Sequence, residues 1–175
     1  NAMRLAGQSC ISVQTVYVHR KLYEEFVAAV AAEVKKLKIG DPLDPATDVG
    51  TLIDEVAAKR VESWIGEAVR GGARLLTGGR RTGAQIEPAV LADASPDMKV
   101  VCDEVFGPVV SLLCYDDIDA VFRTISESRF GLQTGIFTAS TALAIRAVRS
   151  LRTGGVIING SSTGRTDQLA YGGVK

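Results

Sequence analysis

The sequence has little of what several common kinds of site require. Its 175 residues include one histidine and three cysteines, with no CxxC pair and no cluster of cysteine and histidine. An odd number of cysteines without such spacing argues against a disulfide framework and against a zinc site. We therefore expect three thiols outside any disulfide, and no metal.

An excess of charge of one sign is lacking as well. Twenty basic and twenty acidic residues cancel, so no basic field would attract a nucleic acid. No apolar stretch approaches the roughly 20 residues that span a bilayer, and the N-terminus lacks the charged-then-apolar layout of a signal peptide. We expect a cytoplasmic protein whose partner is a small molecule, with neither nucleic acid nor a membrane as a partner.

Length and composition indicate one globular domain. The chain is 46% hydrophobic and 23% charged, which is ordinary for a domain with one sizeable core. Asn1-Ala2 before Met3 resembles the remnant of an expression tag, so the expected domain covers residues 3–175.

Alternating patterns predict an α/β fold with a mostly parallel sheet and flanking helices. Strands are expected at residues 15–19, 73–77, 109–115, 135–138 and 156–159, and helices at 21–38, after Asp54, after Asp116-Asp117 and after Ser140. In the first helix the apolar residues at helical spacing are Leu22, Phe26, Val30, Val34 and Leu37. Residues 86–91 are expected to be extended, either at a sheet edge or as an irregular strand, because Pro88 cannot donate to a ladder.

Gly7-Gln8-Ser9-Cys10 is a small-residue turn that places a cysteine before an apolar segment. If a helix begins at Ile11, its unpaired N–H groups and dipole would favour a thiolate at Cys10. The alternative is that Cys10 is a small buried hydrophobe, and four residues leave both open. Cys102 and Cys114 have no activating group nearby in sequence, and Cys114 lies in an apolar strand, so we expect Cys10 to be the most reactive thiol.

A second motif lies far downstream at Cys102-Asp103-Glu104-Val105-Phe106-Gly107-Pro108-Val109-Val110. Together with Gly7-Gln8-Ser9-Cys10 it resembles the aldehyde dehydrogenase superfamily, and so do residues 40–45, 130–138, 155–159 and 171–175. Residues 7–14 and 160–167 look most like the branch with lactaldehyde, phosphonoacetaldehyde and non-phosphorylating glyceraldehyde-3-phosphate dehydrogenases. Gly160 and Gly164 depart from that pattern, where an acid and an aromatic residue are common.

The resemblance implies a catalytic domain that oxidises an aldehyde to a carboxylic acid with NAD or NADP. It implies that Cys10 forms a thiohemiacetal and then a thioester, that Glu104 binds the nicotinamide ribose, and that Phe106 lies beside the nicotinamide. The backbone N–H of Cys10 would supply part of the oxyanion hole. We also expect Arg165 to face the substrate entrance and to favour aldehydes with an anionic or hydroxylated tail, because a guanidinium suits phosphate or carboxylate. Without the resemblance, Glu104 and Arg165 would be interpreted as solvated surface residues.

In the family, the nucleotide-binding domain, the oxyanion-hole asparagine and the glutamate base precede the cysteine, and none is present here. We therefore expect this chain alone to be inactive, and its partners to be an aldehyde substrate and the missing nucleotide-binding domain or a second copy in a homo-oligomer. One alternative is a truncated, non-catalytic relic that acts by binding or assembly. Another is a cysteine hydrolase or acyltransferase, which needs a histidine near the thiol. His19, expected at the surface, is the only histidine in the sequence.

Overall fold

The computed structural model describes residues 1–164, 166, 168 and 173–175. The chain divides into two compact units, Ala2–Asp116 and Asp117–Lys175, the second of which also includes Asn1. Each unit has its own cluster of buried apolar side chains. The expected single domain over residues 3–175 stays a prediction.

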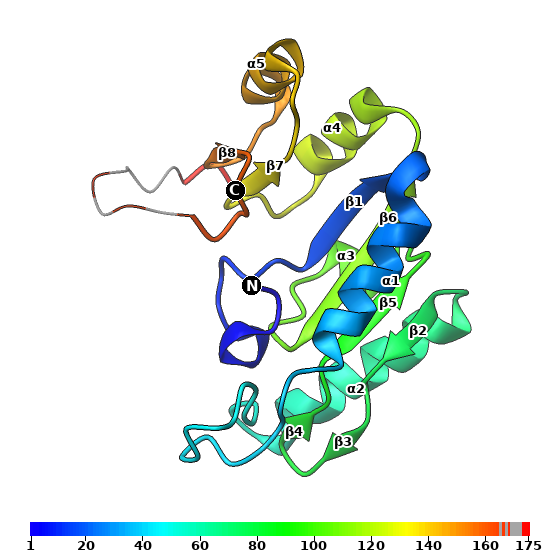
Figure 1. The fold of residues 1–175 in the computed structure, drawn as a ribbon, viewed down its shortest axis with the longest axis vertical. Helices are drawn as coiled ribbons and strands as arrows, with labels where there is room; N and C mark the ends of the chain where they lie inside the picture. Colours follow the sequence, from blue (N-terminus) through cyan, green and yellow to red (C-terminus); the bar gives the residue numbers. More distant parts are fainter. Residues whose placement is uncertain (165, 167, 169–172) are drawn as a thin grey trace. The chain divides into compact units, whose positions relative to one another are not determined.

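The main sheet of the larger unit has four strands in the order β1-β6-β5-β2 (Figure 1). These strands are β1 (Thr15–His19), β2 (Arg74–Thr77), β5 (Ala89–Ala92) and β6 (Val109–Tyr115). Strands β1 and β5 both run parallel to β6, whereas β2 runs antiparallel to β5. The expected mostly parallel sheet with flanking helices is confirmed.

Helices and a small hairpin surround this sheet. They are α1 (Tyr23–Val34), α2 (Glu55–Arg70), the short α3 (Lys99–Cys102), the 3-10 turns η1 (Arg4–Gly7) and η2 (Arg20–Leu22), and the hairpin of β3 (Arg81–Thr82) with β4 (Gln85–Ile86). Helix α1 lies across the sheet in Figure 1. Helix α2 begins where the sequence predicts, because the Asp54 carboxylate accepts a hydrogen bond from the Ala57 N–H at 2.7 Å.

The buried face of the first helix differs from the prediction. Leu22 and Phe26 are 59% and 38% exposed, and the helix ends at Val34 rather than near residue 38. Val30, Val34 and Leu37 are partly buried and pack against the core, as expected, and the fully buried residues of the helix are Tyr23, Val27 and Ala31. Tyr23 faces the sheet, where its hydroxyl donates to the Leu112 carbonyl at 3.2 Å. A buried tyrosine needs such a partner for its hydroxyl, and the sheet supplies it on this side of the helix.

Of the two alternatives for residues 86–91, the edge position is wrong for β5, and the irregular strand is what the structure has: β4 ends at Ile86 and β5 begins at Ala89. Strand β5 lies between β6 and β2, and all four of its residues are buried. Pro88 immediately precedes the strand, so its missing N–H removes no ladder bond from Ala89 onward.

The smaller unit is built on β7 (Thr134–Ile136) and β8 (Val156–Ile158), which pair in parallel. Helices α4 (Ile118–Glu127) and α5 (Thr141–Ser150) contribute its core, which is centred on Phe122, Ala147 and Leu151. Asp117 and Ser140 cap the two helices, as predicted. Across the described ranges, no helix is long and apolar enough to cross a lipid bilayer.

Candidate functional site

Cys10 lies in a tight turn that leads into β1. The Ser12 N–H donates to the Ser9 carbonyl at 2.9 Å, which closes the turn around Cys10 and Ile11, and the Cys10 side chain is exposed. No helix begins between Cys10 and the end of β1, so the expectation of a helix start at Ile11 is wrong. Val13, Thr15 and Val16 are β-branched, and they favour the extended backbone observed there.

Gly7 brings this turn into contact with the downstream motif. Its backbone has a φ of +71°, and a Cβ atom added at this position would lie 1.9 Å from the Gly107 carbonyl oxygen. Any side chain would collide with that backbone, so only glycine permits the approach. The contact joins the start of the cysteine turn to residues 103–107.

Gln14 makes a second connection on the other side of Cys10. Its Nε2 donates to the carbonyl oxygens of Asp103 at 2.6 Å and Val100 at 3.2 Å, and its Oε1 accepts from the Val105 N–H at 2.9 Å. Cys10 is thus bracketed by two residues that both contact the downstream segment. Cys10 is three positions after Gly7, which limits the distance between their Cα atoms to about 11 Å.

The downstream segment alternates between exposed and buried side chains. Glu104 is exposed and Phe106 is 41% exposed, whereas Val105 between them is 1% exposed. Arg60, whose guanidinium lies 4.8 Å from the Trp64 ring centroid, donates through Nη2 to the Val105 carbonyl at 2.7 Å. Burial of Val105 therefore turns the carboxylate and the aromatic ring outward.

Phe106 adopts an unusual backbone conformation. Its φ of +47° lies in the left-handed region, which costs a residue with a side chain about 1–2 kcal/mol. Gly107, directly after it, is packed so closely that an added Cβ would lie 2.8 Å from a methyl carbon of Val61. The packing around Gly107 holds the phenylalanine in this conformation, and such strain is common at functional sites.

Gln8 fixes the outer side of the cysteine turn. Its Oε1 accepts from the Ile53 N–H at 2.8 Å, and its Nε2 lies 3.3 Å from the Thr51 carbonyl oxygen. The sequence shows Gln8 and Gln14 within the motif but gives no signal of these roles, because an amide that bonds a distant backbone looks the same as a solvated one.

The exposed groups of the downstream segment are a carboxylate and an aromatic ring. A carboxylate only accepts hydrogen bonds and a ribose hydroxyl donates, so Glu104 suits a sugar, and the exposed ring of Phe106 suits a flat heterocycle. In the described part of the chain, no group of three His, Cys, Asp or Glu side chains could hold a metal ion.

His19 lies at the far end of the sheet from the cysteine turn. It pairs in register with Tyr115 at the end of β6, its Nδ1 accepts from the Lys21 N–H, and its ring meets Tyr115 edge-on. Gly107 precedes the start of β6, a strand of seven residues that covers about 20 Å. This separation argues against His19 as a base for Cys10.

The other predicted residues have different surroundings. Cys114 packs against the core of the larger unit, as expected, and the Cys102 Sγ lies 3.5 Å from the Asp97 carbonyl oxygen. Arg165 lies outside the described residues.

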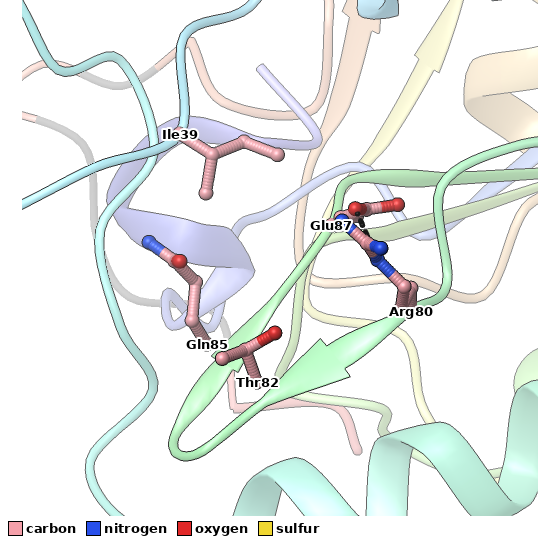
Figure 2. A pocket seen from close by; sticks show the side chains of 5 residues that line it. All are labelled: Ile39, Arg80, Thr82, Gln85 and Glu87. Atoms are coloured by element: carbon pink, nitrogen blue, oxygen red, sulfur yellow. Dashed lines mark hydrogen bonds and ion pairs between the residues drawn. The ribbon is translucent and has the colours of Figure 1, made fainter.

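A pocket of about 220 Å³ lies away from these residues, at the hairpin β3–β4. Figure 2 shows Ile39, Thr82 and Gln85 around it, with Arg80 and Glu87 pointing toward each other. Their ion pair, 2.9 Å between Nε and Oε1, satisfies both charges. None of the predicted site residues lines this pocket.

Comparison with known proteins gives consistent matches. The model of the aldehyde dehydrogenase family matches residues 1–175. A 3-sulfolactaldehyde dehydrogenase from Priestia aryabhattai is 45% identical over 170 residues, which cover 97% of this chain and 36% of that protein. The chain therefore spans about a third of the length of the curated relatives it matches.

Solved structures agree in fold. Aldehyde dehydrogenase 21 from Physcomitrella patens, in complex with the reaction product succinate, is 44% identical with a TM-score of 0.91, covering 95% of this chain and 34% of that one. The glyceraldehyde-3-phosphate dehydrogenase GapN from Methanocaldococcus jannaschii, complexed with NADP, is 34% identical with a TM-score of 0.93, covering 98% of this chain and 37% of that one.

Proposed function

Because this chain belongs to the aldehyde dehydrogenase family, we propose that it supplies the nucleophile and part of the cofactor site for NAD- or NADP-dependent oxidation of an aldehyde to a carboxylic acid. One observation supports this most directly. The turn that exposes Cys10 is tied through Gly7 and Gln14 to the segment that exposes Glu104 and Phe106. The proposed nucleophile and the proposed cofactor-binding residues therefore lie on connected segments.

Cys10 attacks the aldehyde through its thiolate. A bond forms between Sγ and the carbonyl carbon, and the carbonyl electron pair moves onto the oxygen to give a thiohemiacetal. A bound nicotinamide supplies the acceptor for the hydride that the carbon must lose. Glu104 and Phe106 orient that acceptor by binding the ribose and lying against the ring. Water then releases the acid from the Cys10 thioester and restores the thiol.

The proposed substrates are aldehydes with an anionic or hydroxylated tail. The names and bound product of the three relatives include a sulfonate, a carboxylate and a phosphate, each in the same molecule as the reacting aldehyde or the acid formed from it. We propose that Arg165 binds the same kind of tail here, because its planar fork matches such anions.

We propose the complete reaction for a protein that combines these residues with a nucleotide-binding domain. This chain covers about a third of its relatives' length, so binding of the adenosine half of the cofactor falls to that domain.

The test uses the protein as its gene encodes it, with succinic semialdehyde or glyceraldehyde-3-phosphate as substrate. Cys10→Ser should lower the rate of cofactor reduction roughly a thousandfold or more, because a serine hydroxyl is a far weaker nucleophile than a thiolate. Cys114→Ala, which alters the only cysteine in the sheet, is the matched control and should keep the activity. Retained activity in Cys10→Ser would refute the proposal.

A further inference from the structure

We infer that Gln14 is a positioning residue. It bonds to the two peptide groups on either side of Glu104 and so fixes the direction in which the Glu104 side chain points toward the cofactor. The inference rests on the proposed function, since it gives Glu104 the nicotinamide ribose to bind. It adds a residue that contacts neither the substrate nor the cofactor.

The clamp is visible in the atoms that Gln14 contacts. The Asp103 carbonyl belongs to the peptide group before Glu104, and the Val105 N–H belongs to the peptide group after it. Gln14 Nε2 donates to the first at 2.6 Å and Oε1 accepts from the second at 2.9 Å. One planar amide therefore restrains both soft backbone angles of Glu104 and, through them, the direction of its side chain.

Arg60 and Gly7 also hold residues 105–107 of this segment. Arg60 donates to the Val105 carbonyl, so side chains satisfy both polar backbone groups of this buried valine. Gly7 packs directly against the backbone of Gly107. Glu104 lies between these fixed points, and Gln14 is the part of the arrangement that acts on its own peptide groups.

An amide is the side chain that this position requires. It offers a donor and an acceptor from one planar group, and only one orientation satisfies an N–H together with two carbonyls. A glutamate has the same shape, but when ionised it sets an oxygen against the carbonyls of Asp103 and Val100. Those carbonyls would raise the pKa of a carboxyl placed there, and the protonated form would again donate a hydrogen bond.

The difference between an amide and a carboxyl at position 14 can be tested, because a role in packing alone would not make cofactor binding depend on pH. In the gene-encoded protein, the dissociation constant for NAD and NADP is measured by calorimetry in the absence of aldehyde. Gln14→Met should weaken binding of the preferred cofactor roughly tenfold. Gln14→Glu should bind weakly above the pKa of the new carboxyl and regain affinity as the pH falls through it, unlike the wild type.

Gln85→Met is the matched control. Gln85 also donates from Nε2 to a backbone carbonyl, that of Gly40 at 3.1 Å, in the same unit but at the hairpin of Figure 2. This variant should bind the cofactor as the wild type does. An equal loss of affinity in Gln85→Met would mean that general loosening explains the effect, and would overturn the inference.

Glu104→Gln separates the inference from the proposed function. If this variant binds the cofactor as tightly as the wild type, the proposed role of Glu104 is wrong. If Glu104→Gln weakens binding and Gln14→Met does not, only the positioning role is wrong. The inference expects both to weaken binding, and expects Gln14→Met to add little in a chain that already has Glu104→Gln.

Discussion

Cys10 is fixed in place by residues that perform no chemistry themselves. Gly7 allows one backbone to touch another, while Gln8 and Gln14 bond distant segments on the two sides of the turn. The sequence could predict Cys10, Glu104 and Phe106 as a group, because a family motif marks them. It could not predict which neighbours hold them, since that depends on which parts of the chain meet.

Gly7→Ala should damage both stability and the site. The substitution adds left-handed strain and a collision with the Gly107 carbonyl, so we expect the free energy of unfolding to fall by about 2–4 kcal/mol. Urea denaturation measures this loss. Gly83→Ala is the control, because its φ is +60° but the nearest atom to an added Cβ is 3.9 Å away, and it should cost about 1–2 kcal/mol. Equal losses in the two variants would contradict the close contact.

Arg165→Ala should change substrate preference. If the guanidinium binds an anionic tail, kcat/KM should fall at least about tenfold for glyceraldehyde-3-phosphate, and little for an uncharged aldehyde such as propanal. Arg80→Ala, which breaks the ion pair with Glu87 at the hairpin, should leave the ratio of the two values unchanged. Similar losses on both substrates in Arg165→Ala would refute the assignment.

At the scale of the elements, the order of strands and helices could be predicted from the sequence. The buried face of each helix and the neighbours of each strand were harder to predict. Strand β6 was expected from its apolar run, and the caps Asp54, Asp117 and Ser140 from their side chains. Val30, Val34 and Leu37 of the predicted stripe do pack against the core, but the burial of Tyr23 was missed. Its polar tip needs partners at Leu112 and Asp93, which lie about 70 residues or more further along the chain. Spacing within a helix cannot reveal such partners.

Tyr23 ties α1 to the sheet in a pH-dependent way. Its hydroxyl donates to the Leu112 carbonyl and accepts from the Asp93 N–H at 2.7 Å, and burial raises the pKa of Tyr23 from its ordinary 10.0 to about 12. Between these values the folded protein keeps a proton that the unfolded chain has lost. The stabilisation from Tyr23 is therefore complete below pH 10 and declines as the pH rises toward 12.

Tyr23→Phe measures this contribution. At neutral pH the variant should be about 1–3 kcal/mol less stable, because the buried Asp93 N–H loses its acceptor. The difference in unfolding free energy from the wild type should shrink between pH 10 and 12. Burial also raises the pKa values of Tyr17 and Tyr115, but both proteins contain them, so they cancel in the difference. A gap that stays constant over this range would contradict the buried hydroxyl.

At the scale of the whole chain, the sequence predicted the fold class, and the position of the site came only from the structure. Ligands of open α/β sheets commonly lie at the carboxyl ends of parallel strands. Here the cysteine turn precedes β1 and Gly107 precedes β6, so both motifs meet at the amino ends of that pair. The pairing of β1 with β6 and the contacts of Gly7 and Gln14 show that the two motifs meet there.

The 175-residue chain by itself should not oxidise aldehydes. Correct positioning of the cofactor supplies roughly 7–11 kcal/mol of the barrier, and in the proposed function Glu104 and Phe106 hold only its ribose and nicotinamide end. We expect no NADH from aldehyde and NAD, and no saturable binding of NAD by calorimetry at millimolar concentrations. Steady NADH production that Cys10→Ser abolishes would show this expectation to be wrong.

The most direct test of Cys10 as the nucleophile is to locate the covalent intermediate. The gene-encoded protein is mixed with succinic semialdehyde and its cofactor, stopped with acid within a single turnover, and digested for mass spectrometry. We predict a succinyl thioester on the peptide that contains Cys10, formed only when the cofactor is present and absent in Cys10→Ser. A succinyl group on Cys102 or Cys114, or turnover in Cys10→Ser, would contradict the proposed chemistry.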